Sequence, residues 1–276
     1  MKTVTIDSIK IGEGTPLAFF AGPCVIESRD HTMQMAEDIK ELSEETGAPI
    51  VFKVSYDKAN RSSIESYRGP GVEEGAEILA EVKREFGLPI LTDVHEPWQV
   101  EIIGEVADVI QVPAFLCRQT DLILEIAESE RVVNVKKGQF LAPWDMKQVI
   151  SKITSVGNEK ILLTERGASF GYNNLVSDMR SIPIMQEFGY PVVFDATHSA
   201  QLPGGLGKST GGMREHIPAL ARAAIAAGVN AIFMEIHNDV ENALSDSTTQ
   251  WPLQKARALI QQLQAIYEVT QQLEEL

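Results

Sequence analysis

Short apolar segments alternate with amphipathic segments along the whole chain, in eight successive pairs. The apolar segments are rich in β-branched residues, which is typical of strands buried on both faces of a parallel sheet. The predicted strands are Leu17–Ala21, Ile50–Val54, Ile90–Thr92, Val109–Val112, Val132–Val135, Ile161–Thr164, Val192–Phe194 and Ala231–Met234. No linker rich in proline or glycine divides the 276 residues. The chain is therefore predicted to form a single (β/α)8 barrel rather than an open doubly wound sheet.

The segments between these strands carry apolar residues at spacings of three and four, as helices that pack on a sheet do. The predicted helices are His31–Thr46, Val72–Phe86, Trp98–Glu105, Asp121–Glu128, Asp145–Val156, Val176–Phe188, Glu215–Ala227 and Leu253–Leu276. Before the first strand, Val4–Ile11 alternates apolar and polar residues around Asp7-Ser8. This pattern predicts a β-hairpin within residues 1–14 that closes one end of the barrel. Residues 1–276 are thus expected to form one catalytic barrel domain.

The charge of the chain excludes several classes of partner. It carries 39 acidic against 24 basic side chains, a formal net charge of −15. Such a surface repels nucleic acids and anionic membranes, and no apolar run reaches the roughly 20 residues that span a bilayer. Cys24 and Cys117 are the only cysteines, so no disulfide framework is indicated. Without the apolar core of a signal peptide at the amino terminus, a cytoplasmic location is expected.

Polar residues follow nearly every predicted strand. In a (β/α)8 barrel the chemistry lies at this face, where the strands end. The residues in question are Cys24, Lys53, Asp93, His95, Gln111, Lys136, Lys137, Glu165, Arg166, Asp195, His198, Glu235 and His237. Lys136 and Lys137 are adjacent, so only one of them should face the barrel mouth.

Basic residues concentrate at this predicted face despite the acidic composition. Lys53, Lys58, Lys136 and Arg166 come from three different units and predict a substrate with more than one negative charge. Arg61, between Asn60 and Ser62, is suited to a second phosphate at some distance. The alternative for the segment Lys58–Ser63 is a solvated basic loop.

Four potential metal ligands come from the first, seventh and eighth units, which become neighbours when a barrel closes. They are Cys24, His198, Glu235 and Asp246. A thiolate and an imidazole favour Zn²⁺ or Fe²⁺, and the two carboxylates also permit Mn²⁺ or Co²⁺. Spacing alone leaves His95 and His237 as competing ligands, and Cys24 as a buried apolar residue. Cys117 is interpreted as a packing residue.

A glycine-rich segment, Ser199–Met213, follows the seventh strand. Its Gly207-Lys208-Ser209 sequence lacks the preceding glycine of a P-loop, because Leu202 stands at that position. We expect a mobile loop over the site instead.

Eight sequence blocks, in order, resemble the 3-deoxy-D-manno-octulosonate 8-phosphate synthases, also known as 2-dehydro-3-deoxyphosphooctonate aldolases. They are AGPCVIES at 21–28, FKVSYDKANRSSIESYRGPG at 52–71, TDVHE at 92–96, QVPAFLCRQTDL at 111–122, NVKKGQFLAPW at 134–144, TERGASFGYNNL at 164–175, DATHS at 195–199 and ALSDSTTQWPL at 243–253. The resemblance implies a (β/α)8 barrel, usually a homotetramer, that condenses phosphoenolpyruvate with D-arabinose 5-phosphate and water. The products would be 3-deoxy-D-manno-octulosonate 8-phosphate, for the lipopolysaccharide inner core, and inorganic phosphate.

The resemblance also implies roles for individual residues. Cys24 matches the metal-dependent branch, with His198, Glu235 and Asp246 as the other ligands of one divalent ion, which would be Zn, Fe, Mn or Co. The positions that bind phosphoenolpyruvate match Lys53, Lys58, Gln111, Lys136 and Arg166. The positions that bind the sugar phosphate match Asn60, Arg61 and Ser62. The catalytic residues are expected to be Lys53, Lys58, Asp93, Lys136, His198 and Asp246.

Two alternatives stay open at this point. The related 3-deoxy-arabino-heptulosonate 7-phosphate synthases use erythrose 4-phosphate and typically read KPRTS where this chain reads KANRSS, at Lys58–Ser63. That loop is expected to meet the sugar phosphate, so the difference favours arabinose 5-phosphate. A sugar-phosphate sensor without catalytic activity is the alternative from another functional class.

Overall fold

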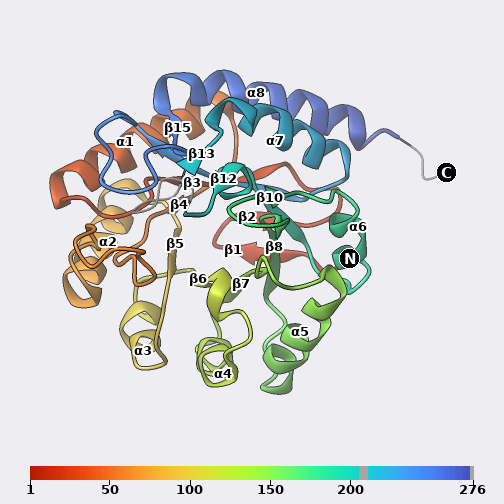
Figure 1. Ribbon diagram of the computed structural model, residues 1–276, viewed down its shortest axis with the longest axis horizontal. Helices are drawn as coiled ribbons and strands as arrows, with labels where there is room; N and C mark the ends of the chain where they lie inside the picture. The colour runs from red at the N-terminus through yellow and green to blue at the C-terminus, as the bar shows by residue number, and fades with distance from the viewer. Residues whose placement is uncertain (205–210, 274–276) are drawn as a thin grey trace.

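Eight parallel strands close into a barrel in the computed structural model, which describes residues 1–204 and 211–273 (Figure 1). The strands are β3 (Ala18–Gly22), β4 (Ile50–Lys53), β5 (Ile90–Asp93), β6 (Val109–Val112), β7 (Val132–Lys136), β8 (Ile161–Glu165), β11 (Val192–Asp195) and β14 (Ala231–His237). Each pairs in parallel with its neighbours, and β14 pairs with both β3 and β11. This closure confirms the predicted (β/α)8 barrel.

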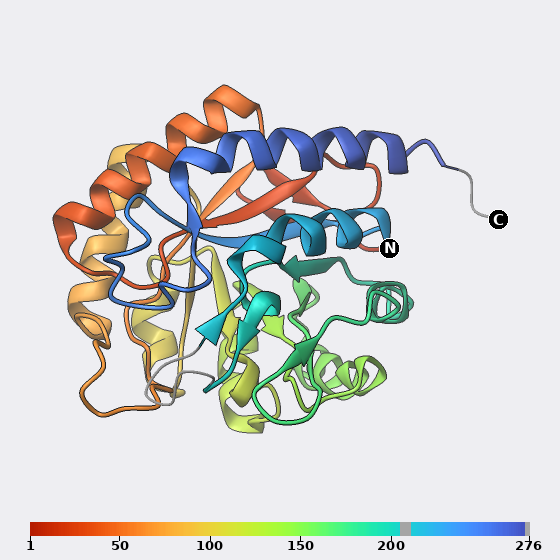
Figure 2. The ribbon, with the colours of Figure 1, turned by 45° about the horizontal axis from the view of Figure 1, so that its top comes forward.

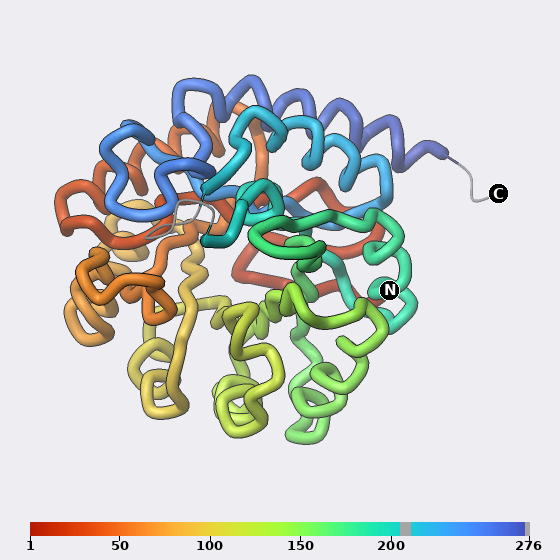
Figure 3. Tube along the Cα trace, in the orientation of Figure 1, coloured from red at the N-terminus to blue at the C-terminus, as the bar shows by residue number. Residues whose placement is uncertain are grey.

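Helices form a ring outside the strands (Figures 1 and 3). They are α1 (Arg29–Thr46), α2 (Val72–Phe86), α3 (Gln99–Gly104), α4 (Thr120–Glu128), α5 (Met146–Ser155), α6 (Ser181–Gln186), α7 (Ile217–Ala226) and α8 (Leu253–Thr270). Helix α1 begins where the Ser28 hydroxyl accepts a hydrogen bond from the His31 N–H, at 3.2 Å, and ends at Gly47 with φ 65°. No helix of the described residues is long and apolar enough to cross a membrane.

The core has two layers because successive strand residues point to opposite faces. In β3, Phe19 and Ala21 pack outward against the helices, whereas Ala18 and Phe20 point into the barrel. The predicted hairpin is present as β1 (Val4–Ile6) and β2 (Ile9–Ile11), paired antiparallel. Its four isoleucine and valine side chains are buried in the same cluster as the barrel interior. They are Val4, Ile6, Ile9 and Ile11.

Short elements interrupt several loops on the face where the strands end. They are β9 (Ala168–Ser169), β10 (Leu175–Val176), β12 (Gln201–Leu202), β13 (Gly211–Gly212), β15 (Trp251–Pro252) and the 3₁₀ turns η1 (Ala114–Leu116), η2 (Pro143–Asp145), η3 (His198–Ala200) and η4 (Arg214–His216). The β9–β10 and β12–β13 pairs are antiparallel hairpins.

Several helix predictions were wrong at their ends; α1, for example, begins at Arg29, two residues before the predicted His31. The sixth helix was predicted over Val176–Phe188 but begins at Ser181, because Val176 pairs with Ala168 and Pro183 is tolerated only in a first turn. Helix α7 begins at Ile217, two residues late, because η4 precedes it. Helix α8 ends at Thr270, and residues 274–276 of the prediction lie outside the described part of the chain.

Candidate active site

A cavity of about 630 Å³ opens at the carboxyl ends of the barrel strands. Most of the residues predicted for the site line it, as the barrel rule requires. They are Lys53, Lys58, Asn60, Arg61, Ser62, Asp93, Gln111, Lys136, Arg166, His198, Glu235 and Asp246. Cys24 is fully buried, beside the lining residues Glu235 and Asp246. The structure thus brings together residues from distant parts of the sequence.

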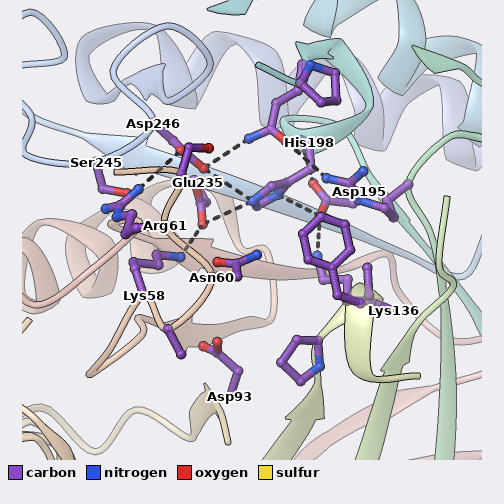
Figure 4. Close-up of a pocket in the computed structure, with 18 of the residues that line it drawn as sticks. Lys58, Asn60, Arg61, Asp93, Lys136, Asp195, His198, Glu235, Ser245 and Asp246 are labelled. Carbon is purple, nitrogen blue, oxygen red and sulfur yellow. Dashed lines mark hydrogen bonds and ion pairs between the residues drawn. The ribbon is translucent and has the colours of Figure 1, made fainter. Parts of the chain in front are cut away.

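The four predicted metal ligands converge beside this cavity. The ligand atoms of Cys24, Glu235 and Asp246 lie within 4.8 Å of one another. His198 Nε2 lies 3.6 Å from Glu235 Oε1 and 3.6 Å from Asp246 Oδ2 (Figure 4). Cys24 follows β3, Glu235 lies in β14, His198 opens η3 after β11, and Asp246 comes from the loop between β14 and β15.

The chemistry of this donor set fits a divalent cation. Burial raises the pKa of the Cys24 thiol, and the carboxylates of Asp246 and Glu235 raise it further. Without a cation, then, the thiolate form is strongly disfavoured. Glu235 Oε2 is buried and has no hydrogen-bond partner among the described residues. His198 Nδ1 lies 2.8 Å from Asp195 Oδ2, which leaves Nε2 to face the carboxylates, as in carboxylate–histidine–metal arrangements.

Two lysines approach the same cluster from β4 and the loop after it. Lys53 Nζ donates to Glu235 Oε1 at 2.6 Å and to the Cys24 carbonyl at 3.0 Å. Lys58 Nζ donates to Ser55 Oγ at 3.1 Å and lies 3.7 Å from Glu235 Oε1. Burial raises the pKa of Glu235, but Lys53, His198 and Lys58 together hold it well below its ordinary range. The Glu235 carboxylate is therefore ionised.

Two further cations lie across the cavity. Lys136 is buried and pairs with Asp195. The pKa of Lys136 is lowered to about 8. Burial is the largest cause, Lys53 and Arg166 add to it, and Asp195 opposes it. Arg166 Nη2 donates to Gln201 Oε1 at 3.0 Å, whereas its buried Nη1 has no partner among the described residues. A buried guanidinium N–H without an acceptor indicates a place for an anionic ligand.

The neighbouring Lys137 behaves as the strand geometry predicted. It does not line the cavity. Its Nζ donates instead to the Leu141 carbonyl at 3.3 Å and lies 3.4 Å from Glu165 Oε1. Only Lys136 of the pair faces the barrel mouth.

Arg61, which was predicted to bind a second phosphate, lines the cavity. Its Nε donates to the Tyr67 carbonyl at 2.9 Å, and its Nη1 lies 3.8 Å from Asp246 Oδ1. Its buried Nη2 has no partner among the described residues. Asn60 and Ser62 flank it as exposed lining residues. The loop is thus part of the cavity wall, not a freely solvated segment.

Asp93 and Gln111 lie on the floor of the cavity. Asp93 accepts hydrogen bonds from the Ser55 hydroxyl at 2.5 Å, and its other oxygen lies 3.1 Å from His95 Nε2. Burial raises the pKa of Asp93, but His95 and the two lysines, Lys58 and Lys53, hold it well below its ordinary range. Gln111 Oε1 accepts a hydrogen bond from Asn134 Nδ2 at 3.0 Å, which fixes the orientation of its amide.

The competing histidines lie outside the metal-ligand cluster. His95 contacts Asp93, and His237 Nε2 lies 3.2 Å from Glu27 Oε1. Cys117 is fully buried in the outer core layer, as its interpretation as a packing residue requires. Of the glycine-rich segment after β11, residues 201–202 and 211–212 form the β12–β13 hairpin. The middle of the expected mobile loop, residues 205–210, lies outside the described residues.

Two residues of the site were given no functional role from the sequence, although Asp195 was predicted to lie at the face where the strands end. Asp195 accepts hydrogen bonds from the His198 N–H at 2.9 Å and the Thr197 hydroxyl at 3.1 Å, besides its pair with Lys136. Its position at a strand end was the available signal. Gln201 Nε2 donates to Asp246 Oδ2 at 3.0 Å and so links that carboxylate to Arg166. Nothing in the sequence pattern distinguished Gln201.

Comparisons with known proteins agree with this architecture. The model of the DAHP synthetase I family matches residues 2–275. The 2-dehydro-3-deoxyphosphooctonate aldolase of Geobacter sp. (strain M21) is 56% identical over 271 residues, which cover 98% of this chain and 99% of that protein. The protein of the same name from Pelobacter propionicus is 58% identical over 265 residues, 96% of this chain and 97% of the relative. The chain therefore belongs to the DAHP synthetase I family and, within it, to the 2-dehydro-3-deoxyphosphooctonate aldolases.

Proposed function

We propose that this protein condenses phosphoenolpyruvate with D-arabinose 5-phosphate and water to give 3-deoxy-D-manno-octulosonate 8-phosphate and inorganic phosphate. The observation that carries the proposal is a cavity with two separate groups of anion-binding residues beside one cluster of metal-ligand atoms. The inner group contains four cations, and the outer group contains Arg61 with its polar neighbours. Two anionic substrates require two such groups. The relatives named above, at 56% and 58% identity, bear the name of this activity.

Phosphoenolpyruvate is assigned to the inner group of cations. Lys136 and Arg166 would hold its phosphate, with Lys53, Lys58 and Gln111 toward its carboxylate and enol carbon. The support for this assignment is the unpartnered Arg166 Nη1 and the burial of Lys136, since both are satisfied by a phosphate oxygen. A dianionic phosphate also stabilises the protonated form of Lys136, which burial disfavours.

Arabinose 5-phosphate is assigned to the outer group. Arg61, with Asn60 and Ser62, would bind the sugar's phosphate at the cavity rim, so that its aldehyde reaches inward. The buried, unpartnered Arg61 Nη2 supports this assignment. The ionised Asp93, which lines the cavity, is suited to accept a hydrogen bond from a sugar hydroxyl.

Cys24, His198, Glu235 and Asp246 would hold one divalent ion, which we propose to be Zn, Fe, Mn or Co. When bound, such an ion polarises an oxygen of the aldehyde or of a water molecule. Asp195 keeps the His198 ring in place, and Gln201 does the same for the Asp246 carboxylate. Both residues thereby set the direction of the donor atoms.

The reaction follows from these positions. The electron pair of the phosphoenolpyruvate C=C bond forms a new bond from C3 to the aldehyde carbon, the C=O π bond of the aldehyde breaks, and positive charge develops at C2. Water adds at C2, and the bond from C2 to the bridging oxygen then breaks, so that this oxygen leaves with the phosphate. Of the two protons of the water that adds at C2, one goes to the former aldehyde oxygen and the other leaves with the phosphate. Lys136 and Arg166 stabilise the charge that grows on the departing phosphate. Lys53 and Lys58 stabilise the carboxylate next to C2.

Isotope tracing tests this proposal. Phosphoenolpyruvate labelled with ¹⁸O in its bridging oxygen is incubated with arabinose 5-phosphate, and both products are analysed by mass spectrometry. We expect ¹⁸O in the inorganic phosphate and none in the keto acid. Label retained in the keto acid would refute C–O cleavage. Absence of any octulosonate product would refute the activity itself.

We also propose that four copies of this chain assemble into a homotetramer. Exposed aromatic side chains lie on three consecutive loops, after β6, β7 and β8. They are Phe115, Phe140, Trp144, Phe170 and Tyr172. A hydrogen bond of 2.9 Å from the Ser169 N–H to the Gln139 carbonyl joins two of these loops. Clustered exposed aromatics of this kind are typical of protein interfaces, and light scattering after size-exclusion chromatography measures the mass.

The setting of the reaction is proposed from the family resemblance alone. The enzyme would act in the cytoplasm and supply the lipopolysaccharide inner core. Loss of inner-core sugar in a strain that lacks the gene, restored by the gene on a plasmid, tests this role.

A further inference from the structure

A second cluster of titratable side chains lies outside the cavity, between the start of α1 and the loop that joins β14 to β15. It consists of Glu27, His31 and His237. His237 Nε2 lies 3.2 Å from Glu27 Oε1, and the rings of His31 and His237 stack with centroids 4.7 Å apart. His31 Nε2 lies 3.2 Å from Asn238 Oδ1. These side chains join the start of α1 to the end of β14. Figure 2 shows the ribbon of both elements in the colours of Figure 1.

The hydrogen bonds of His237 favour a structural link over a metal site. Its Nδ1 accepts a hydrogen bond from the Asp239 N–H at 2.9 Å. Nδ1 is therefore unprotonated, and in the neutral ring the proton must be on Nε2, where it is donated to Glu27. A metal ion on Nε2 would require that proton to move to Nδ1, against the Asp239 N–H. The ring is thus set as a donor to Glu27.

Glu27 also holds the backbone of the loop that carries Asp246. Its Oε1 accepts a hydrogen bond from the Leu244 N–H at 2.8 Å. Leu244 is two positions from Asp246, and Ser245 between them contacts Cys24, with 2.8 Å between Oγ and Sγ. The Glu27 side chain is mostly buried, with 14% exposed, so water competes weakly for this acceptor.

Asp246 itself has a backbone conformation that needs support. Its φ of 43° lies in the left-handed region, which is unfavourable for a residue other than glycine. Its carbonyl accepts hydrogen bonds from the Thr249 N–H at 2.9 Å and the Gln250 N–H at 3.0 Å, which fix the side of the loop after Asp246. On the side before it, two contacts hold the backbone: the Leu244 N–H donates to Glu27, and the Ser245 carbonyl accepts a hydrogen bond from Gln250 Nε2 at 2.8 Å.

We propose that Glu27, oriented by His237, is a positioning residue that fixes the loop before Asp246 and so places its carboxylate among the other ligand atoms. The inference rests on the proposed function for the identity of the ligand cluster, and it assigns a role to two residues outside that cluster. Glu27 acts through the backbone, from a distance, and touches no substrate.

Hydrogen–deuterium exchange tests the contact without any metal. In Glu27→Ala the Leu244 amide loses its acceptor, so its exchange, followed in peptides from 239–250, should become roughly 10- to 100-fold faster. Glu27→Gln retains an acceptor oxygen and should preserve most of the protection. Glu44→Ala, an exposed glutamate of α1 without a role in the loop, is the matched control. Unchanged exchange in Glu27→Ala would overturn the proposal.

Cobalt binding tests the consequence for the ligand cluster. Co²⁺ is titrated into chelator-treated protein and followed by the absorption of the thiolate–cobalt bond. Glu27→Ala should weaken Co²⁺ binding by about tenfold or more, as losses of outer hydrogen bonds do, and Glu27→Gln should restore it. Faster exchange with unaltered Co²⁺ binding would overturn the positioning role. If the unmutated protein binds no Co²⁺, the proposed metal is wrong, and the exchange experiment alone then decides whether Glu27 fixes the loop.

Discussion

Replacing Asp195 with asparagine should strongly weaken the binding of phosphoenolpyruvate at neutral pH, because Lys136 then loses its proton. Asp195 is fully buried and pairs with the Lys136 ammonium, which is itself buried. The pKa of Lys136 is lowered to about 8 by burial, with Lys53 and Arg166 adding to the effect, and Asp195 opposes the fall. Asp195→Asn keeps the shape of the side chain and removes its charge.

The size of the effect follows from the electrostatics of the pair. Two unit charges about 4 Å apart interact by about 4 kcal/mol at an effective dielectric constant of about 20. That energy corresponds to about three pH units. The pKa of Lys136 should thus fall from about 8 to about 5 in the variant. At pH 7 the protonated fraction then drops from roughly 0.9 to roughly 0.01, and phosphoenolpyruvate binding weakens by roughly 90-fold.

Isothermal titration calorimetry with phosphoenolpyruvate from pH 5 to pH 9 measures this effect. The protein is first treated with a chelator, because Asp195 also contacts the proposed metal ligand His198. Without the ion, the substitution cannot act through metal binding. In the unmutated protein, affinity should fall as the pH rises through about 8, since the protonated lysine is the binding form. Asp178→Asn, which alters an exposed pair with Arg180, is the matched control. Equal affinity of Asp195→Asn and the unmutated protein at pH 7 would refute the reasoning.

Three further substitutions test separate parts of the site. Cys24→Ser should remove most of the activity, because a hydroxyl is a poor ligand for the proposed ion. The measurement is turnover as a function of free metal concentration. Near-normal turnover of the variant in metal-free buffer would contradict the prediction. Arg61→Ala should raise the KM for arabinose 5-phosphate by about 10- to 100-fold and leave that for phosphoenolpyruvate unchanged; equal changes in both would argue against two separate anion sites. Gly22→Ala should lower the free energy of unfolding by about 2 kcal/mol or more, because φ of Gly22 is +155° and the added Cβ would lie 2.2 Å from the Lys53 carbonyl oxygen. Urea denaturation measures the free energy of unfolding. Unaltered stability would show that β3 and β4 can separate locally.

The barrel was predictable because its pattern is local. Each strand is a short apolar run, and the residue that follows it reaches the same face in every unit. Lys53, Lys136 and Glu235 were found by this rule alone. The sixth helix was misjudged because Val176 has the apolar character of a helix face but pairs with Ala168 across a loop. Such a hairpin leaves little signal in a single sequence.

Residues outside the strand ends depended on other information. Asp246 lies in a long loop after β14, beyond the strand end. The adjacency of the barrel units made it a possible metal ligand, and the family resemblance then implied that role. The spacing of His198, His95 and His237 could not rank them, because the ranking depends on where each ring points in three dimensions. Gln201 was missed for a related reason. Its two partners, Arg166 and Asp246, become its neighbours only after the chain folds.

The central claim is tested most directly by phosphate release from phosphoenolpyruvate with arabinose 5-phosphate or erythrose 4-phosphate, each before and after chelator treatment. We expect release with arabinose 5-phosphate that is lost on chelation and restored by a divalent ion. Preference for erythrose 4-phosphate would contradict the proposed substrate, and activity that survives thorough chelation would contradict the role of Cys24 as a metal ligand.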